Sequence, residues 1–271
     1  MTLKAGVVGW PIAQSKSPRI HGYWIKQHRL DATYEPIALS EDEFETGIRD
    51  LISEGFKGLN VTIPHKEAAF RLADKLSDRA QAIGAVNTLV FREDHIFGDN
   101  TDGIGFSANI KAKYPSWKGG NAPAAVFGAG GAARGIVWAL LEIGYNEVRV
   151  FNRTVSRSIE LASSFGDRVH AISGSLDEIC KDADFFVNTT SVGMNGKGSI
   201  DVDLMHLKPD AIVSDIVYSP LETDLLRRAR LSNFRTVDGL GMLLHQAVPG
   251  FEAWFDTKPV VTDELRQLVL S

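Results

Sequence analysis

Seven residues decide the fold of this 271-residue chain: Gly128-Ala129-Gly130-Gly131-Ala132-Ala133-Arg134. An apolar run over 124–127 leads into them, a helical pattern over 133–143 follows, and a second apolar run covers 148–151. A glycine-rich turn between a strand and a helix holds a dinucleotide pyrophosphate against the helix N-terminus. Gly128 permits the tight turn, Gly130 lets the backbone approach the phosphates, and Ala133 takes the third small position. An ordinary tight turn is the weaker interpretation, because the second strand follows at the spacing of a dinucleotide unit.

The end of the second strand indicates which dinucleotide is bound. Units selective for NAD place Asp or Glu there to bind the ribose 2′-hydroxyl. This chain has Asn152-Arg153-Thr154 instead, with Arg157 one turn further on. Arginines attract a 2′-phosphate and can bind two of its oxygens. Solvated helix-start residues are the alternative, but arginine at a helix N-terminus is unfavourable without an anion. The pattern therefore favours NADP.

Composition excludes several other classes of protein. The net charge is -5 with no basic tract, so nucleic acid is not an expected partner. The single cysteine, Cys180, lies in a predicted helix over 176–182 and reads as a small buried apolar residue. The N-terminus lacks a signal pattern, and no apolar run reaches membrane-spanning length. We expect a cytoplasmic protein that does not associate with membranes.

Strands and helices alternate along the whole chain. In the first hundred residues we expect strands over 4–9, 33–39, 58–63, 88–91 and 96–99, and helices over 18–27, 41–53, 66–72 and 77–83. After a helix over 104–113, a stretch rich in Gly, Pro and Asn over 116–123 marks a boundary. Strands near 124–128, 147–151, 169–172, 184–188, 211–216 and 235–237 then alternate with helices, which predicts a doubly wound parallel sheet.

The chain therefore predicts an α/β protein of two domains. Residues 1–105 and 240–271 form a substrate-binding and catalytic domain, and residues 106–239 form a Rossmann domain for NADP. The C-terminal helices, over 240–255 and 262–270, return to the N-terminal domain. The first of them is too apolar to lie free in solvent, so we expect it to line the cleft between the domains.

Two local signals mark helix starts in the first domain. Ser40 followed by Glu43 matches a capping box, and Pro18 suits a first helical turn. Ser15 and Ser17 flank the same helix start behind the first strand, where hydroxyls add donors to an anion-binding helix N-terminus. The alternative is that one serine is an N-cap and the other fills the loop.

Three further groups of polar residues exceed what folding requires. Asn60, Thr62 and Pro64 share one face by period 2, and Lys66 begins the next helix. A lysine at a helix start opposes the macrodipole, although an exposed lysine tolerates this. Asn87 lies at a strand entrance, and Asp102 precedes a helix, where an N-cap role is the alternative. His21, His65 and His245 lack metal spacing, so we expect them to pack in the core or to support neighbouring site residues, with no bound metal.

On these residues the chain resembles the shikimate dehydrogenases over essentially its whole length. The motifs that carry the resemblance occur in the family's order: Ser-x-Ser-Pro at 15–18, Asn-Val-Thr-x-Pro-x-Lys at 60–66, Gly-Ala-x-Asn-Thr at 84–88, Gly-x-Asn-Thr-Asp-Gly at 98–103, Gly-Ala-Gly-Gly-Ala at 128–132, Asn-Arg-Thr at 152–154 and Asp-Gly-x-Gly-Met-Leu-x-x-Gln-Ala at 238–247. The resemblance implies NADPH-dependent, reversible reduction of 3-dehydroshikimate to shikimate, on the pathway to aromatic amino acids.

The resemblance also implies a role for each matching residue. Lys66 and Asp102 would form the catalytic pair. Ser15, Ser17 and Tyr218 would bind the substrate carboxylate, and Asn60, Thr62, Asn87 and Gln246 its ring hydroxyls. The cofactor-binding residues would be Gly128, Ala129, Gly130, Gly131 and Ala132 at the pyrophosphate, Asn152, Arg153, Thr154 and Arg157 at the adenosine end, Thr190, Ser191, Ile216, Gly239 and Met242 at the nicotinamide side, and Asp78.

The chemistry would divide between cofactor and protein. NADPH supplies a hydride, and the Lys66 ammonium stabilises the developing alkoxide and donates the proton. Asp102 orients the lysine; desolvation and ion pairing shift the lysine pKa in opposite directions, and the sequence does not decide between them. The expected partner is the small-molecule substrate, and the protein is expected to be a monomer or a homodimer.

Three alternatives remain open at this stage. A quinate/shikimate dehydrogenase would accept NAD and a more hydroxylated ring, against which the absence of an acid at Asn152 argues. A methylenetetrahydrofolate dehydrogenase would not need the Ser15 and Ser17 pair. A non-catalytic NADP-sensing module could lose Lys66 or Asp102, and both are present.

Overall fold

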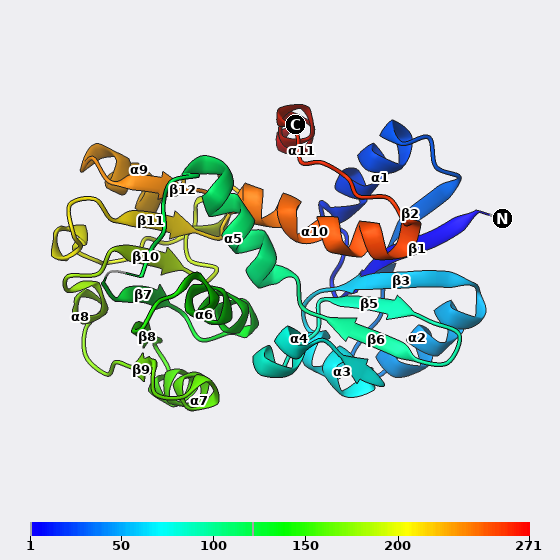
Figure 1. The fold of residues 1–271 in the computed structure, drawn as a ribbon, viewed down its shortest axis with the longest axis horizontal. Helices are drawn as coiled ribbons and strands as arrows, with labels where there is room; N and C mark the ends of the chain where they lie inside the picture. The colour runs from blue at the N-terminus through cyan, green and yellow to red at the C-terminus, as the bar shows by residue number, and fades with distance from the viewer. Residues whose placement is uncertain (1, 121) are drawn as a thin grey trace. The chain divides into compact units, whose positions relative to one another are not determined.

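The computed structural model describes residues 2–120 and 122–271, which divide into two compact units. Unit 1 comprises residues up to Thr101 together with Leu244–Ser271, and unit 2 comprises Asp102–Leu243. Each unit is built on a six-stranded sheet within the described residues (Figure 1). The boundaries fall within four residues of those expected from the sequence, and the second one lies inside helix α10 (Gly239–Phe255).

The sheet of unit 1 is mixed. Its strands, in the order they lie side by side, are β2 (Ala32–Ala38), β1 (Leu3–Gly9), β3 (Phe56–Val61), β5 (Thr88–Phe91), β6 (Ile96–Asp99) and β4 (Lys75–Leu76). β1 is parallel to β2 and β3, whereas β5 is antiparallel to β3 and β6. The short strand β4 was not expected, because two residues carry no periodic pattern.

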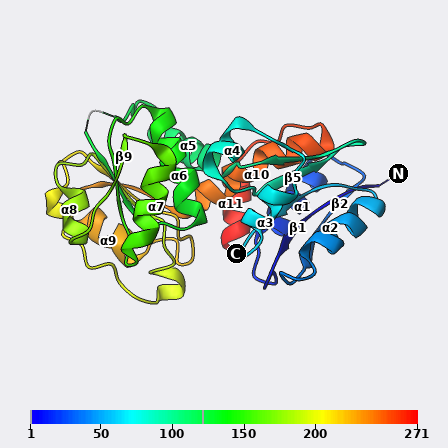
Figure 2. The same ribbon diagram turned by 90° about the horizontal axis from the view of Figure 1, so that it is seen from below.

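Helices cover both faces of this sheet. They are α1 (Ser17–Gln27), α2 (Phe44–Ser53), α3 (Lys66–Leu72), α4 (Asp78–Ile83), the C-terminal part of α10, and α11 (Asp263–Leu270). α2, α3 and α4 pack on one face through a core that includes Phe44, Ile48 and Leu59. α10 lies on the opposite side of the sheet from α2 (Figure 2) and brings Phe251 against Trp24 of α1. The return of the C-terminal helices to the N-terminal unit is confirmed.

The local signals of unit 1 require two corrections. α2 begins at Phe44, three residues after the expected start, and Ser40 does not complete a capping box. The Glu43 carboxylate accepts from the Ser40 backbone N–H at 3.0 Å, but the Ser40 hydroxyl donates to that carboxylate instead of capping the helix. β3 ends at Val61, so the period-2 face expected to include Thr62 and Pro64 stops short of both.

Unit 2 has the expected doubly wound parallel sheet. Its strand order is β12 (Arg235–Val237), β11 (Ile212–Asp215), β10 (Phe185–Asn188), β7 (Ala124–Phe127), β8 (Val148–Phe151) and β9 (Val169–Ala171), with all neighbours parallel. The chain winds outward in both directions from the centre of this sheet, between β7 and β10. In sheets of this type, ligands bind at the carboxyl ends of the strands beside that switch point.

Alternating side chains of these strands feed two cores, one on each face. The first face carries α5 (Asp102–Lys113), α6 (Gly131–Ile143) and α7 (Val155–Phe165), which pack on Val126, Phe185 and Val187. The second carries α8 (Leu176–Cys180), α9 (Asp224–Leu231) and short 3₁₀ turns at Met194–Gly196 and Leu204–His206. Cys180 is fully buried there, which confirms its packing role, and burial raises its pKa to about 12. No helix among the described residues is long and apolar enough to cross a membrane.

Candidate active site

The N-terminus of α1 presents two serines. Ser15 Oγ accepts a hydrogen bond from the Ser17 backbone N–H at 3.3 Å, and Ser17 is buried. The N-cap residue is Lys16, whose side chain caps nothing, so the interpretation of one serine as the N-cap is wrong. Pro18 lies in the first turn, as expected. Backbone N–H groups and hydroxyls at a helix N-terminus suit an anion such as a carboxylate.

The chain after β3 carries Thr62 and Lys66. Thr62 donates its backbone N–H to Val8 O at 3.0 Å, which holds it beside the end of β1. Lys66 is the first residue of α3, and its carbonyl accepts from the Val86 N–H at 3.0 Å. Residues 63–65 form a turn, so this segment leaves the strand before α3 begins, and Ile63 is exposed.

Asn87 is the centre of a buried polar cluster. Its Oδ1 accepts from the Thr101 backbone N–H at 2.9 Å and from Thr88 Oγ1 at 2.9 Å, and its Nδ2 donates to Thr101 Oγ1 at 3.1 Å. Asn60 joins the cluster through Nδ2, which donates to Thr88 Oγ1 at 3.3 Å. Thr101 Oγ1 also donates to the backbone carbonyl of Gln246 at 2.8 Å. Asn60, Asn87 and Gln246, three residues predicted to bind ring hydroxyls, are thus linked within unit 1.

Tyr34 and His21 lie behind this cluster. The Tyr34 hydroxyl donates to Asn60 Oδ1 at 2.7 Å. The His21 ring stacks on Tyr34 with centroids 3.9 Å apart. Burial lowers the pKa of His21 to about 3, an effect that the Asn60 side chain partly opposes, so the imidazole is neutral. The packing role expected for His21 is confirmed.

A second polar anchor holds the chain between β6 and α5. The Asp99 carboxylate accepts from Ser77 Oγ at 2.6 Å, from Arg79 Nε at 2.7 Å and from the Asn100 backbone N–H at 2.7 Å. It fixes the segment that leads through Thr101 to Asp102. Asp102 is buried and is the first residue of α5 rather than the residue before it.

The remaining predicted residues of unit 1 are peripheral to these clusters. Asp78 is exposed at the start of α4, in unit 1, whereas every other residue predicted to bind the cofactor lies in unit 2. His65 contacts the Leu39 carbonyl at 2.7 Å and stacks on Phe44, which confirms its packing role. Within the described residues, no group of three or more His, Cys, Asp or Glu side chains is arranged to hold a metal ion.

The glycine-rich turn of unit 2 joins β7 to α6. Gly128 has φ +114°, and a Cβ there would collide with Thr189 Oγ1, so glycine is required for both conformation and space. At Gly130, the N-cap of α6, an added Cβ would meet no atom within 4 Å. The N-terminus of α6 is therefore accessible and uncapped by any side chain, as a pyrophosphate site requires. Ala133 is fully buried, in agreement with its predicted packing position.

The end of β8 presents two free cations. Arg153 and Arg157 are both exposed, and within residues 2–120 and 122–271 neither forms an ion pair with a carboxylate. Arg157 lies in the first turn of α7, whose N-cap is Thr154 and whose first turn contains no acid. Asn152 Nδ2 donates to the Thr154 carbonyl at 2.9 Å, which fixes the turn between them.

The carboxyl ends of β10 and β11 carry the residues predicted for the nicotinamide side. Asn188 Oδ1 accepts from the Thr190 N–H at 3.0 Å and Oγ1 at 2.7 Å, while the Asn188 carbonyl accepts from the Ile216 N–H at 3.1 Å. Gly239 lies against the carbonyl of Ile216, where any side chain would collide. Met242 is buried on α10, and burial raises the pKa of Tyr218. Ser191 is exposed next to Thr190.

Comparison with known proteins supplies the family. Residues 7–89 match the shikimate dehydrogenase substrate-binding domain, and residues 111–195 match the shikimate / quinate 5-dehydrogenase domain. The shikimate dehydrogenase (NADP(+)) of Paramagnetospirillum magneticum is 50% identical over 98% of both chains. The chain belongs to the shikimate dehydrogenase family.

Solved structures share the fold across the whole chain. Shikimate 5-dehydrogenase from Thermus thermophilus, solved with NADP(H) and shikimate, is 33% identical with a TM-score of 0.88 over 99% of this chain and 98% of that one. Quinate dehydrogenase from Corynebacterium glutamicum, solved with NAD, is 31% identical with a TM-score of 0.91 over 99% of both. The two-domain α/β fold expected from the sequence is confirmed.

Sequence reasoning overlooked several buried or half-buried side chains that organise the site. They are Tyr34, Arg79 and Asp99 in unit 1, and Asn188, Asp215 and Thr223 in unit 2. For Asn188 and Asp215 a signal was available, since each is a polar residue that ends an apolar strand of a parallel sheet. For Tyr34 there was none, because an aromatic residue in a strand is ordinarily core.

Proposed function

We propose that this chain catalyses the reversible, NADP-dependent reduction of 3-dehydroshikimate to shikimate. The observation that carries the proposal is the full-length similarity to NADP-dependent shikimate dehydrogenases, combined with two unpaired arginines where an NAD-selective site would have an acid. In this proposal, unit 1 binds the ring and unit 2 binds the cofactor.

Unit 1 offers matching groups for an acidic polyhydroxylated ring. Ser15 and Ser17, at the N-terminus of α1, are proposed to bind the carboxylate, together with Tyr218. Asn60, Thr62, Asn87 and Gln246 are proposed to bind the hydroxyls. The amides of Asn60 and Asn87 are already fixed by hydrogen bonds, so little conformational entropy is lost when a ring binds.

Unit 2 fits a dinucleotide phosphate. The uncapped α6 N-terminus beyond Gly130 suits the pyrophosphate, and the exposed Arg153 and Arg157 suit a 2′-phosphate. Thr190, Ser191, Ile216, Gly239 and Met242 are proposed to line the nicotinamide side, and Asp78 is the one proposed cofactor contact from unit 1. When bound, NADPH supplies the hydride for the carbonyl carbon.

Lys66 and Asp102 are proposed as the catalytic residues. In the reductive direction, the Lys66 ammonium stabilises negative charge that develops on the carbonyl oxygen, transfers a proton to it and regains a proton from solvent. In the oxidative direction, the neutral amine accepts the hydroxyl proton. Asp102 orients the lysine and accepts a hydrogen bond from the neighbouring ring hydroxyl.

The decisive experiment compares substrates and cofactors in one assay. Purified protein is mixed with shikimate or quinate and with NADP⁺ or NAD⁺, and the absorbance of the reduced nicotinamide is followed. We expect the highest kcat/KM with shikimate and NADP⁺. Preference for quinate with NAD⁺ would identify a quinate dehydrogenase, and NADP⁺ binding without turnover on either ring would identify a sensing module.

The expected assembly is a monomer or a homodimer, and the expected location is the cytoplasm. Size-exclusion chromatography with light scattering distinguishes the two assemblies.

A further inference from the structure

We propose that Asp215 is a positioning residue for the nicotinamide side of the cofactor site, because its carboxylate joins the loop after β10 to the loop after β11. The inference rests on the proposed function, which assigns Thr190 and Ile216 to the nicotinamide side. Asp215 itself is the last residue of β11 and is proposed to touch neither cofactor nor substrate.

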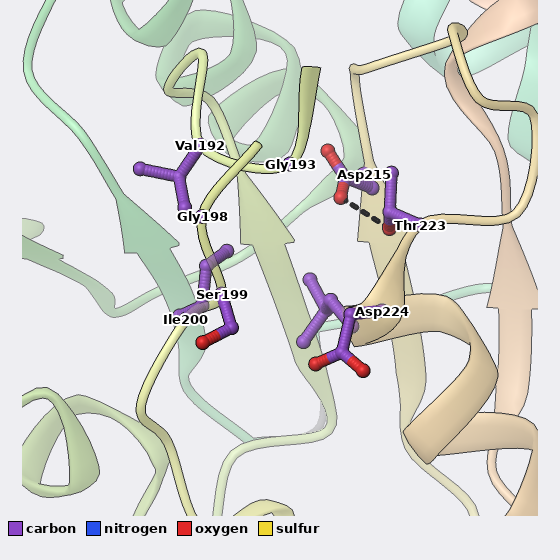
Figure 3. Close-up of a pocket in the computed structure, with 9 residues that line it drawn as sticks. Val192, Gly193, Gly198, Ser199, Ile200, Asp215, Thr223 and Asp224 are labelled. Atoms are coloured by element: carbon purple, nitrogen blue, oxygen red, sulfur yellow. Dashed lines mark hydrogen bonds between the residues drawn. The ribbon is translucent and has the colours of Figure 1, made fainter. Parts of the chain in front are cut away.

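The Asp215 carboxylate accepts three hydrogen bonds from three segments. Oδ1 accepts from Asn188 Nδ2 at 2.9 Å, at the end of β10, and from the Val217 backbone N–H at 3.0 Å. Oδ2 accepts from Thr223 Oγ1 at 2.7 Å, at the start of α9 (Figure 3). One side chain thus connects the two strand ends beside the proposed nicotinamide site with a helix on the far side of the sheet.

Asn188 extends this connection to Thr190. Its Nδ2 donates to Asp215 and to the Val192 carbonyl, so its Oδ1 is left to accept from the Thr190 N–H and hydroxyl. Asp215 and the Val192 carbonyl hold the amide in this orientation, because a flipped amide would place its oxygen against theirs. Asp215 therefore helps to set where Thr190 lies, through one intervening residue.

The Asp215 carboxylate is buried without a cationic partner in the part of the chain that the structure describes, which costs folding free energy. Asp215, Asn188 and Thr223 are at most 2% exposed, and no cationic side chain among the described residues pairs with Asp215. Burial raises the pKa of Asp215 to about 6 despite its three hydrogen bonds. A buried charge held only by neutral donors is unfavourable. An ionised carboxylate has only acceptor oxygens, so it cannot present a donor to Asn188 as an amide or hydroxyl could.

The cavity beside Asp215 is too small for a ligand site. Val192, Gly193, Ser199 and Thr223 are among the residues that line it, and its volume is about 10 Å³ (Figure 3). A single water needs roughly 10–15 Å³. The Asp215 cluster therefore supports neighbouring loops rather than binding a substrate.

The test compares Asp215→Ala, which removes all three acceptors, with Thr223→Val as matched control. Thr223→Val removes an equally buried hydrogen bond to the same carboxylate, but on the side away from Asn188. Calorimetry gives the Kd for NADP⁺, and steady-state kinetics give kcat and both KM values. We expect Asp215→Ala to raise the Kd and KM for NADP⁺ about tenfold, as for loss of a charge-assisted hydrogen bond. The KM for shikimate should stay unchanged.

The control and a rescue variant make the result specific. Thr223→Val should lower Tm but leave the NADP⁺ Kd within twofold. Asp215→Asn, which keeps an oxygen toward Asn188 and Val217, should recover most of the NADP⁺ affinity. If Asp215→Ala does not fold, Asn188→Ala tests the same link, because it frees Thr190 while Asp215 keeps its other partners.

Three results would overturn the inference. They are unchanged NADP⁺ affinity in folded Asp215→Ala or Asn188→Ala, an equal rise in the KM for both ligands, or an equal effect of Thr223→Val on NADP⁺. Failure of the proposed function looks different: wild-type protein binds NADP⁺ but does not oxidise shikimate, and the calorimetric comparison of variants then still decides the role of Asp215.

Discussion

In unit 1 the polar side chains nominated for substrate binding are mostly buried and bonded to one another, whereas in unit 2 the nominated cations are exposed and unpaired. Asn60 and Asn87 are at most 5% exposed and make hydrogen bonds to Tyr34, Thr88 and Thr101. Arg153 and Arg157 are exposed, and the glycine turn offers only backbone N–H groups. The proposed site residues of unit 1 are held in fixed positions by hydrogen bonds, whereas those of unit 2 present accessible positive charge.

The difference follows from the size of the two proposed ligands. A small ring presents a few hydroxyls at fixed angles, so discrimination requires side chains that cannot rotate. A dinucleotide is long, and its phosphates can be bound by a helix N-terminus and flexible cations. Substitutions in unit 1 should therefore affect stability and substrate KM together, while substitutions of the unit 2 arginines should affect cofactor affinity alone.

Lys66→Ala should have the largest effect on activity. Loss of a general acid–base group lowers kcat by roughly 10²–10⁴-fold, and the KM for shikimate should change much less. Because Lys66 lies in unit 1, the calorimetric Kd for NADP⁺ should match wild type. Lys57→Ala, which replaces an exposed lysine of β3, is the control and should retain wild-type kcat. Wild-type turnover in Lys66→Ala would remove the residue from the chemistry.

Asp215→Asn should change how stability depends on pH. Folding raises the pKa of Asp215 from 3.8 to about 6, so its contribution to stability is fully present below pH 3.8 and is lost as the pH rises through 6. The full loss amounts to about 3 kcal/mol, and about half of it falls between pH 5 and pH 8. The exposed fraction of Asp215 is 1%, so solvent screening is small.

Urea unfolding at pH 5 and pH 8 measures this prediction as a difference between two proteins. The free energy of unfolding of Asp215→Asn minus that of wild type should become more positive at pH 8 by about 1.5 kcal/mol, since the amide does not titrate. Asp224, which lines the same cavity, titrates in both proteins and cancels. If the difference in the free energy of unfolding does not depend on pH, Asp215 has an ordinary pKa. That result would contradict this prediction without contradicting the positioning role of Asp215.

Arg153→Asp should weaken NADP⁺ binding far more than NAD⁺ binding. Replacing a cation beside a 2′-phosphate with an anion should raise the KM for NADP⁺ by about tenfold to hundredfold. Lys181→Asp makes the same change in charge at another exposed position of unit 2 and should affect both cofactors little. Tm should not move, because Arg153 makes no ion pair within the described residues. Equal losses for NADP⁺ and NAD⁺ would contradict a 2′-phosphate site.

The regular parts of both units could be predicted because their signals are local. The strand at Thr88–Phe91 and the helix at Lys66–Leu72 lie at the residues expected, and the alternation of strands with helices after residue 124 predicted the parallel sheet. α2 was placed three residues early because Ser40 and Glu43 form only half of the expected pair of hydrogen bonds. A capping box and a simple Ser–Glu contact have the same sequence.

The pairing of these polar side chains could not be predicted because the partners are distant in sequence. Tyr34 reaches Asn60, Arg79 reaches Asp99, and Asn188 reaches Asp215, and each pair lies on separate elements. The motifs named one member of the Tyr34–Asn60 pair through its match to a family, but nothing in the spacing of residues indicates which side chain supports another. Only the register of the sheets brings these groups together.

The Tyr34–Asn60 hydrogen bond gives the smallest effect and tests the comparison most directly. The Tyr34 hydroxyl donates to Asn60, which is proposed to bind a ring hydroxyl. Tyr34→Phe keeps the ring stacked on His21 and removes only that hydroxyl. If unit 1 depends on fixed amide geometry, the KM for shikimate should rise severalfold, and the free energy of unfolding should fall by about 1 kcal/mol. The KM for NADP⁺ should not change.

Tyr23→Phe is the matched control for this variant. Its hydroxyl donates to Glu264 at 3.0 Å on the exposed side of α1, so both the KM for shikimate and the free energy of unfolding should stay at wild-type values. A loss of stability in Tyr34→Phe with an unchanged KM would mean that Thr88 and the Asn87 carbonyl suffice to orient the Asn60 amide. The Tyr34 hydroxyl would then serve only the stability of the core. The contrast between fixed side chains in unit 1 and exposed cations in unit 2 would have to rest on Asn87 and Thr101 instead.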